Sequence, residues 1–532
     1  MWNRSGARGT PRTPPILPMP DFKTLKPLAL ASRSLAASLL IAFAATSLPG
    51  AWAQSRLPTL GDGNELTTSA ERKLGDRIIR ELYRDPDYID DAVLLEYVQG
   101  TFQPLVAAAR ARGELSPELD ERFAWEILLG RDRTVNAFAL PGGYLGVHLG
   151  LIGVVATRDE LASVLAHELS HVTQRHIARL LGQQSRTTPL MLGALVLGAL
   201  AASKNPNAAQ ALVVGGQALA VQNQLNFSRD MEREADRIGY GLMEPGGFAP
   251  QGFVTMFDKL QQANRINDNG SWPYLRSHPL TTQRIADMHS RLPPGQGSAP
   301  QPTPTLEHAM LAARARVLSR PGVDVLRQWA AEPQGSGFAA QPLPKRVAAW
   351  YAAALGQAQL HDFAAARRML APLKEAVRDD AAARRQVQLL AAELELEAGQ
   401  PQAALQHLPA GAGADSARPE LVLRTQVLLR LGRAAEMAAP LQTWLATHPQ
   451  DATLWQLLAG VWNEQGQPLR AIRAEAEAQA ARYDYAAAVD RFKAGQDLAR
   501  RGGAQSDYIE ASIIDTRLRA VESRLREQAA ER

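Results

Sequence analysis

Apolar residues recur every three or four positions early in the chain. Leu74, Ile78 and Ile79 follow this spacing, which places them on one face of a helix. We therefore expect packing helices within residues 66–130.

Apolar and small residues between positions 136 and 145 surround the sequence Pro141-Gly142-Gly143. Proline and paired glycines favour a tight turn, so this segment predicts a short strand and a hairpin. A strand edge at this place would let an extended peptide bind through backbone hydrogen bonds, without a demand for one particular sequence.

A helix is expected directly after the hairpin. Asp159 and Glu160 suit its amino terminus, where acidic side chains interact favourably with the helix dipole. Its later part holds His167 and His171, and its apolar positions are Leu161, Val164 and Leu165.

Two apolar runs, residues 189–202 and 208–221, follow this helix, and each is too short to span a bilayer. One interpretation is a helical hairpin packed on the protein. The other is a mobile or membrane-touching flap near the cleft, and the sequence is compatible with both.

The second half of the chain is predicted to be helical and to form a separate domain. Residues 293–304 are rich in Pro, Gly and Gln, which marks a linker, and residues 305–532 follow it. Turn-forming glycines recur at Gly399, Gly432 and Gly466, which are 33 and 34 residues apart. A period near 34 residues is typical of tetratricopeptide helix-turn-helix repeats, whose concave surface binds peptides or proteins; the alternative is an irregular helical bundle without a groove.

The first 53 residues have the pattern of a cleavable secretory signal. Basic residues precede an apolar run at positions 35–45, and Ala51-Trp52-Ala53 supplies small residues for cleavage before Gln54. The alternative, an uncleaved membrane anchor, would need a longer apolar run, and Met19 is an alternative initiator. Residues 1–53 hold six of the 58 basic and one of the 54 acidic residues, so 52 basic and 53 acidic residues remain, with no basic excess for nucleic acid.

The chain has no cysteine, which excludes disulfides and thiolate metal ligands. A metal site must therefore use His and carboxylate side chains. The sequence His167-Glu168-Leu169-Ser170-His171 matches the pattern H-E-x-x-H. On a helix, the two imidazoles lie on one face and can meet one zinc ion, while Glu168 projects about 100° away toward metal-bound water, as a general base requires.

A catalytic zinc needs a third protein ligand. His176 is a weak candidate because it lacks the spacing of an extended H-E-x-x-H motif, and we expect it to be exposed. Glu232 is the better candidate, since Asp236 lies four residues later on the same helix face and can accept a hydrogen bond from a ligand histidine. Glu234 would point elsewhere.

These segments, together with Ser277-His278-Pro279 and Arg284, resemble the M48 peptidase family. With the signal and the repeats, the chain is similar to periplasmic members of that family over nearly its whole mature length. The resemblance implies a mainly α fold. An α+β zincin-type metallopeptidase domain, helical with a small β-sheet, would cover residues 54–292, and an all-α tetratricopeptide-like repeat domain would follow.

The same resemblance implies a metal site. One Zn²⁺ per chain would be bound by His167, His171 and Glu232, with Asp236 behind a ligand histidine.

The implied catalytic residues are Glu168, His278 and Arg284. Glu168 would be the base, and His278 would lie over the metal as a regulatory or transition-state residue supported by Arg284. An imidazole in the fourth coordination position would displace the water and silence the site, so we expect a latent enzyme that a substrate or partner opens.

The expected function is that of an exported zinc endopeptidase of the periplasm, associated with the outer membrane and in peripheral contact with it. Its implied substrates are unfolded or misassembled outer-membrane proteins, whose assembly it would aid, and its implied partner is the β-barrel assembly machinery; nucleic acid is not an expected partner. The alternative function is a chaperone or adaptor that acts mainly through its repeats with little proteolysis. An exopeptidase would need a group that captures a free substrate terminus, and the sequence shows no such signature.

Overall fold

The computed structural model describes residues 66–182, 228–265, 271–292, 304–410, 416–502 and 507–530, and Gly61–Arg532 form one compact unit. The predicted signal, the two predicted apolar runs and nearly all of the predicted linker lie outside the described residues. Within the described part, no helix has the length and apolar character that crossing a bilayer requires.

Three helices open the described chain, as the apolar spacing predicts. They are α1 (Thr68–Leu82), α2 (Ala92–Ala111) and α3 (Pro117–Arg122). Leu74 and Ile78 are fully buried on α1.

The helical prediction is wrong at two strands, β1 (Tyr88–Ile89) and β2 (Glu126–Gly130). β1 has two residues, too few to show a period. The three central residues of β2 are all buried, so its sequence lacks the alternation that distinguishes a half-buried strand.

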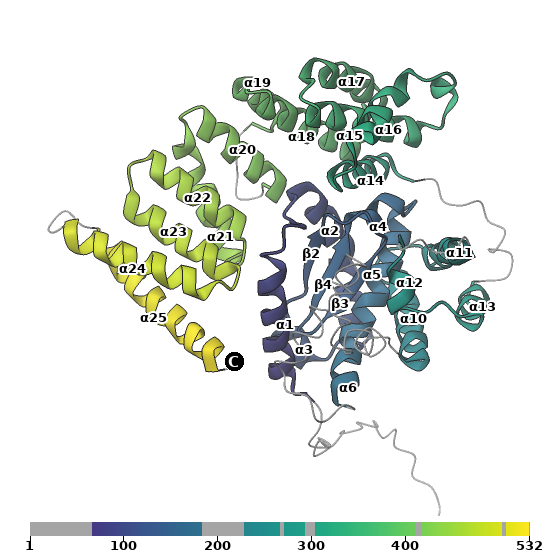
Figure 1. Cartoon of the computed structure of the whole chain (residues 1–532), viewed down its shortest axis with the longest axis horizontal. Helices are drawn as coiled ribbons and strands as arrows, with labels where there is room; N and C mark the ends of the chain where they lie inside the picture. The colour runs from purple at the N-terminus through teal and green to yellow at the C-terminus, as the bar shows by residue number, and fades with distance from the viewer. Residues whose placement is uncertain are drawn as a thin grey trace, which may run out of the picture. The chain divides into compact units, whose positions relative to one another are not determined.

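The predicted hairpin is formed by β3 (Ala137–Leu140) and β4 (Tyr144–His148). Gly142 and Gly143 have φ angles of +80° and +85°, a left-handed conformation that glycine adopts without strain. The strands lie in the order β1-β2-β4-β3, with β2 parallel to β4 and the other neighbours antiparallel. β3 is therefore an edge strand of the sheet (Figure 1).

The helix predicted after the hairpin is α5 (Arg158–Thr173). Thr157 caps its amino terminus, where the threonine hydroxyl accepts a hydrogen bond from the backbone N–H of Glu160. The other helices of this half are α4 (Leu149–Val154), α6 (His176–Gly182), α10 (Arg229–Met243), α11 (Gln251–Arg265), α12 (Tyr274–Ser277) and α13 (Thr282–Ser290).

Helix α10 packs closely on α5. A Cβ atom on Gly239 of α10 would lie 3.1 Å from the backbone carbonyl of Ala166, the residue before His167. Because Gly239 has no side chain, the two backbones approach each other, and the acidic side chains of α10 come within reach of the histidines of α5.

The chain from residue 306 onwards is helical wherever the structure describes it, as predicted. Helices α14 (Leu306–Leu318) and α15 (Val323–Ala331) and two 3-10 turns, Glu332–Gln334 and Phe338–Ala340, come first. Helix pairs then follow one another (Figure 1): α16 (Leu343–Gln359) with α17 (Phe363–Ala376), α18 (Ala381–Glu397) with α19 (Pro401–His407), α20 (Arg418–Arg430) with α21 (Ala438–Thr447), α22 (Ala452–Glu464) with α23 (Pro468–Ala481), and α24 (Tyr485–Gly502) with α25 (Tyr508–Ala530). A 3-10 turn, Ala434–Met437, joins α20 to α21.

The recurring glycines end the first helix of three successive pairs. Gly399, Gly432 and Gly466 have φ angles of +71°, +67° and +66°. Glycine is favoured at this position after a helix because it has no Cβ to oppose the left-handed conformation. The 33- and 34-residue spacing therefore marks real structural units.

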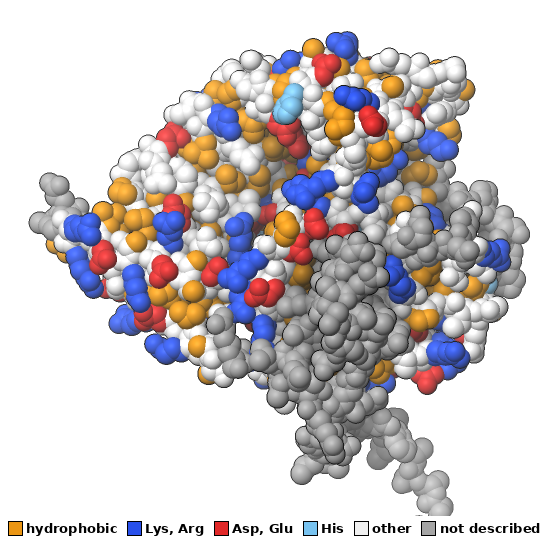
Figure 2. All heavy atoms as spheres, in the orientation of Figure 1, with side chains coloured by type: hydrophobic (Ala, Val, Ile, Leu, Met, Phe, Trp, Pro, Cys, Tyr) orange, Lys and Arg blue, Asp and Glu red, His pale blue; other side chains and the backbone are white. Residues whose placement is uncertain are grey.

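Three arginines, which we call the arginine seam, link the repeat half to the first half. Each binds one acidic side chain of α2 or the turn before it and one acidic side chain of the repeat half, with N···O distances of 2.6–2.7 Å: Arg314 to Asp91 and Glu393, Arg385 to Glu96 and Glu420, and Arg418 to Asp90 and Asp451. On the face of the molecule shown in Figure 2, basic and acidic side chains lie among one another.

Tyr483, in the turn between α23 and α24, makes a further contact with the first half. It has a φ angle of +58° and is 7% exposed. Its hydroxyl lies 2.8 Å from the hydroxyl of Tyr144, the first residue of β4, and 3.3 Å from Nη2 of Arg72.

Candidate functional site

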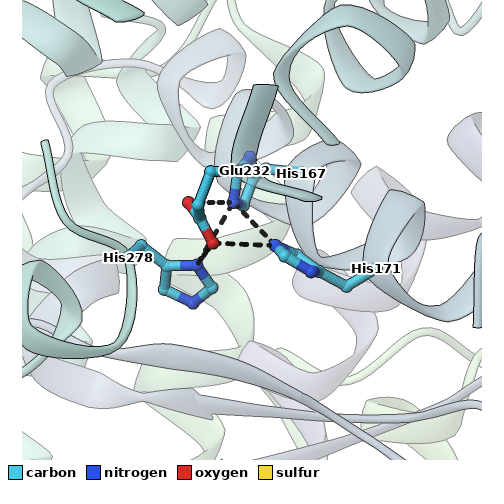
Figure 3. A group of neighbouring side chains, drawn as sticks. All are labelled: His167, His171, Glu232 and His278. Atoms are coloured by element: carbon cyan, nitrogen blue, oxygen red, sulfur yellow. Dashed lines mark hydrogen bonds and ion pairs between the residues drawn. The ribbon is translucent and has the colours of Figure 1, made fainter. Parts of the chain in front are cut away.

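Four side chains from three separate segments of the sequence meet in the interior. Each offers one ligand atom, and these atoms lie within 4.8 Å of one another; the residues are His167, His171, Glu232 and His278. Their exposed fractions are at most 2% (Figure 3). The structure thus brings together the three predicted ligands and the histidine expected above the metal.

The spacing of the ligand atoms fits a tetrahedral metal ion. His167 Nε2 lies 3.0 Å from His171 Nε2 and 3.5 Å from Glu232 Oε2, and His171 Nε2 lies 3.5 Å from Glu232 Oε1. Atoms that bind a tetrahedral zinc at about 2.0–2.1 Å are roughly 3.3 Å apart. Two imidazole nitrogens and one carboxylate group, which turns one oxygen toward each histidine, therefore have the chemistry and the spacing of a three-ligand site.

Opposing electrostatic environments surround the two histidines of α5. Burial by itself lowers the pKa of His167, but contacts with Asp236 and Glu232 outweigh burial and raise that pKa to about 9. Burial, together with the neighbouring His167, lowers the pKa of His171 well below its ordinary value, which keeps this ring neutral. The carboxylates that favour a proton on His167 would equally favour a metal cation in its place.

Asp236 holds His167 in the expected orientation. One of its carboxylate oxygens lies 3.0 Å from Nδ1 of His167, which leaves Nε2 of that ring directed at the cluster. Arg284 donates to both oxygens of Asp236 at 2.7 and 2.8 Å and lies 2.8 Å from Oε2 of Glu232.

The pKa values of both carboxylates are shifted downward. Burial by itself raises the pKa of Asp236, but the hydrogen bonds and charge of Arg284 outweigh burial and lower it. Burial also acts to raise the pKa of Glu232, yet the charge of His278 and the hydrogen bond from His167 hold it well below the ordinary value. Arg284 contacts both of these buried negative charges, and the two histidines share in compensating that of Glu232.

Glu168 projects from α5 toward the edge strand. Its Oε2 accepts a hydrogen bond of 2.9 Å from the backbone N–H of Ala139 in β3. Its Oε1 lies 3.4 Å from Nε2 of His278 and accepts no hydrogen bond from the described residues. The fully buried carboxylate therefore has one oxygen free of protein donors within the described part of the chain.

His278 follows directly after the short helix α12, in the loop context that the sequence predicts. Its Nδ1 lies 3.3 Å from His167 Nε2 and 3.0 Å from Glu232 Oε1. The ring of Tyr274 packs beside it at a centroid distance of 4.6 Å. Arg284 donates to the carbonyl of Pro279 at 2.9 Å, which ties the loop to the same guanidinium group.

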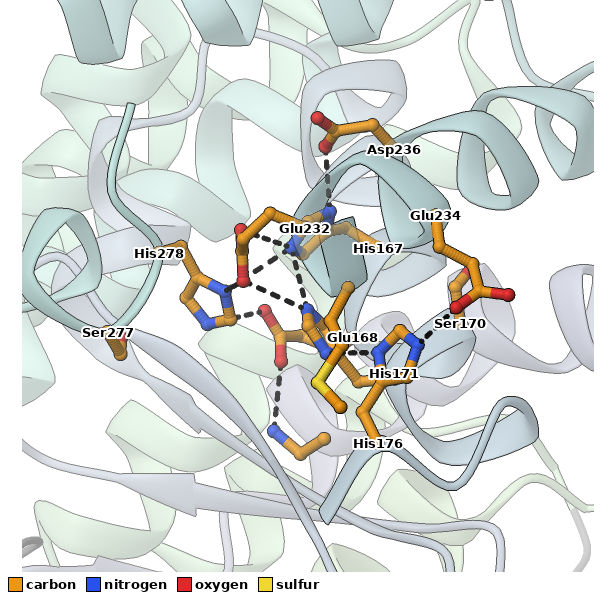
Figure 4. Close-up of polar contacts among 12 residues, drawn as sticks. His167, Glu168, Ser170, His171, His176, Glu232, Glu234, Asp236, Ser277 and His278 are labelled. Atoms are coloured by element: carbon orange, nitrogen blue, oxygen red, sulfur yellow. Dashed lines mark hydrogen bonds and ion pairs between the residues drawn. The ribbon is translucent and has the colours of Figure 1, made fainter. Parts of the chain in front are cut away.

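His176 corrects one prediction. We expected an exposed residue, but it is fully buried, and its Nδ1 lies 2.9 Å from Nδ1 of His171. Its Nε2 lies 3.0 Å from Oε2 of Glu234, which points away from the metal cluster as predicted (Figure 4). Helical spacing could not reveal this contact, because α5 ends before His176 and Arg175 turns the chain with a φ angle of +52°.

Known proteins are similar to this chain in sequence. Residues 97–292 match the family model for peptidase family M48. The chain is 29% identical to the β-barrel assembly-enhancing protease of Escherichia coli K12 over 502 residues, which are 91% of this chain and 96% of that protein. It is 33% identical to the β-barrel assembly-enhancing protease of Yersinia pestis over 274 residues, which are 51% of this chain and 54% of that protein.

A mitochondrial relative matches a shorter region. The mitochondrial metalloendopeptidase OMA1 of Saccharomyces cerevisiae is 30% identical over 201 residues, which are 37% of this chain and 55% of that protein. In this comparison and in the one with the Yersinia protein, the chain matches about half the length of the relative. The buried H-E-x-x-H cluster lies inside the region that matches the family model. Residues 97–292 of this chain are therefore a metallopeptidase domain of family M48.

Proposed function

We propose that this chain is a zinc-dependent endopeptidase that holds one Zn²⁺ through His167, His171 and Glu232. The observation that supports the proposal is the 3.0–3.5 Å spacing of their ligand atoms in a buried cluster. Two imidazoles and one carboxylate are typical of catalytic zinc, which keeps its fourth position for water or substrate.

The residues around the cluster are arranged for peptide hydrolysis. When bound, the cation polarises the scissile carbonyl and lowers the pKa of a coordinated water. Glu168 would act as the general base: Oε2 is held by the Ala139 N–H, and Oε1 is the oxygen left to take a proton and to return it to the leaving amine. The edge strand β3, which anchors Glu168, would align an extended substrate through backbone hydrogen bonds.

We further propose that the enzyme rests in a latent form. Nδ1 of His278 is as close to His167 Nε2 and to Glu232 Oε1 as the ligand atoms are to one another, so its imidazole would fill the fourth position. Arg284 would hold the loop in this closed arrangement through the carbonyl of Pro279. Movement of the loop by a substrate or partner would open the site.

The test is metal content and casein cleavage of purified protein and four variants. We expect one zinc per chain in the wild type, zinc retained but cleavage lost in Glu168→Gln, and zinc lost in Glu232→Gln. His278→Ala should cleave faster than the wild type, whereas the same change at the half-exposed His289 should leave the rate unchanged. A wild-type protein that binds no zinc would refute the metallopeptidase proposal, and a His278→Ala rate equal to the wild-type rate would refute latency alone.

The proposed setting is the periplasm, beside the outer membrane. Support comes from the signal-like pattern of residues 1–53 and from relatives named β-barrel assembly-enhancing proteases. The proposed clients are unfolded or misassembled outer-membrane proteins, and the β-barrel assembly machinery is the proposed partner. We propose domain limits at residues 54–292 for the peptidase and 305–532 for tetratricopeptide-like repeats, with the linker between them.

One observation favours a second function, that of a chaperone or adaptor. A cavity of about 990 Å³ lies between the peptidase domain and the repeats, and its lining includes Trp125, Arg418 and Trp444. None of its lining residues belongs to the metal cluster, so a client could bind there without being cleaved. An experiment in cells can distinguish the two functions, because Glu168→Gln should abolish a proteolytic function and leave an adaptor function intact.

A further inference from the structure

A buried contact chain leads away from the metal cluster on the side opposite to His278. His171 touches His176 through their Nδ1 atoms at 2.9 Å, and His176 Nε2 lies 3.0 Å from Oε2 of Glu234. The guanidinium group of Arg179 donates to the same oxygen of Glu234 at 2.9 Å. Figure 4 shows the three residues from His171 to Glu234 in line.

The positions of the protons in this chain follow from the chemistry of imidazole. A neutral imidazole has one protonated nitrogen, so a His171 that gives Nε2 to a cation must have its proton on Nδ1. That N–H can donate to Nδ1 of His176, 2.9 Å away, which must then be unprotonated. His176 therefore has its own proton on Nε2, where Glu234 accepts it. Each group fixes the tautomer of the one before it.

The backbone is strained at the residue directly before His176. Arg175 lies between α5 and α6 with a φ angle of +52°, a left-handed conformation that costs a residue with a side chain about 1–2 kcal/mol. The ion pair of 2.9 Å between Arg175 and the buried Glu71 holds this turn. Without the turn, α5 would continue, and a residue five positions after His171 would lie on a different face of the helix. Strain of this kind is typical of functional sites.

We propose that His176 is a positioning residue that, with Glu234, holds His171 in the tautomer whose Nε2 binds the metal ion. Nδ1 of His171 thus contacts an imidazole, which in turn contacts the carboxylate of Glu234. Nδ1 of His167, by contrast, contacts the carboxylate of Asp236 without an intervening residue. This inference rests on the proposed zinc site. It assigns a role to residues outside both the ligand set and the catalytic base.

The test compares two substitutions that differ in one hydrogen-bond acceptor. His176→Asn keeps an acceptor, because Oδ1 of asparagine occupies the place of Nδ1 of histidine. His176→Phe keeps the ring and removes the acceptor. The matched control is His289→Phe, which changes a half-exposed histidine paired with Asp258. The zinc dissociation constant is measured by chelator competition on the purified chain, and the melting temperature of each metal-free protein is measured beside it.

We expect His176→Phe to raise the zinc dissociation constant about 10- to 100-fold, the usual effect of losing a hydrogen-bond partner of a ligand histidine. His176→Asn should remain within a few-fold of the wild type, and His289→Phe should be unchanged. In zinc-loaded protein labelled with ¹⁵N-histidine, the Nδ1–H proton of His171 should be protected from solvent exchange in the wild type and in His176→Asn only.

Three outcomes would overturn the inference, and they are distinguishable. Equal zinc affinity in wild type, His176→Asn and His176→Phe would show that the contact does not position His171. Equal weakening in both variants, with lower melting temperatures of the metal-free proteins, would show that His176 only fills space. A wild type that binds no zinc would remove the proposed site itself, and with it the basis of this inference.

Discussion

At the scale of single residues, the site is a balance of buried charges. Two carboxylates, Glu232 and Asp236, lie in the interior at 1–2% exposure, and one guanidinium group contacts both. Burial of such charges is unfavourable unless each has a partner. Arg284 is therefore needed to hold the ligands in place, although it is not itself one of the residues that would bind the metal.

Replacement of Arg284 tests this balance. Arg284→Met should destabilise the metal-free protein by about 3–5 kcal/mol, because it removes the guanidinium group that contacts both buried carboxylates. Urea denaturation in the presence of a chelator measures the loss. The matched control is Arg237→Met, which changes an exposed arginine of α10 and should shift the free energy of unfolding little. A similar loss in both variants would contradict the argument.

The residue scale also shows what sequence can predict of a site. Five of the predicted site residues lie on two helices: His167, Glu168 and His171 on α5, and Glu232 and Asp236 on α10. Helix geometry alone indicates that residues four positions apart share a face and that Glu168 projects from a different one. His278 was predicted only from the family resemblance, because residues in a loop have no periodic spacing in the sequence. His176 and Tyr274 were missed, because their positions depend on a left-handed residue and on the packing of a four-residue helix, and neither has a sequence signal of this kind.

At the scale of elements, the distance between α5 and α10 decides whether the ligands meet. Glu232 and the two histidines belong to different helices, and the helices touch where Gly239 faces the backbone of Ala166. Such close packing has no periodic pattern in the sequence, so the third ligand could be proposed but its approach to the others could not be derived. The strands β1 and β2 could not be predicted either, because their residues do not alternate between apolar and polar.

Gly239→Ala should weaken this contact. Alanine favours a helix by about 1 kcal/mol over glycine, but the new Cβ would lie 3.0 Å from the ring of Phe253 and 3.1 Å from the Ala166 backbone, so one of them would have to shift. We expect a net destabilisation of about 1–3 kcal/mol and weaker zinc binding. Gly241→Ala on the same helix is the control, because its Cβ would meet only the flexible end of Arg112; it should be neutral or stabilising. Thermal denaturation and chelator competition measure the two effects, and equal stability of both variants would argue against the close contact.

At the scale of the whole molecule, the arginine seam connects the repeats to the peptidase domain. The recurring glycines made the helical repeats predictable, but the docking of one domain on another depends on side chains that are far apart in sequence. Arg418 and Asp90, for example, are separated by more than three hundred residues and lie 2.7 Å apart. Both are mostly buried in this contact, so salt screens it less than a surface pair.

The pH dependence of the seam can be predicted from Asp90. Burial by itself raises the pKa of Asp90, but the charge and hydrogen bonds of Arg418 lower it below the ordinary value of 3.8. A lowered pKa means that the folded state favours the ionised form, so the stabilisation is complete well above pH 3.8 and disappears as the pH falls through the folded-state pKa. Asp90→Asn should therefore destabilise the metal-free protein by about 1–3 kcal/mol near pH 6, and the difference from the wild type should shrink toward pH 3.

Urea denaturation across this pH range measures that difference. Asp379→Asn serves as the control, because Asp379 is exposed and its contact with Arg378 lies on the surface. A difference between wild type and Asp90→Asn that stayed constant down to pH 3 would exclude Asp90 as the titrating group.

The contact of Tyr483 has a mechanical consequence. Tyr144, which it touches, pairs with Leu140 at the closed end of the hairpin, and the neighbouring Ala139 holds Glu168. The turn between α23 and α24 is therefore linked to Glu168 through one short β-ladder, so a displacement of this turn would bear on the position of the Glu168 carboxylate.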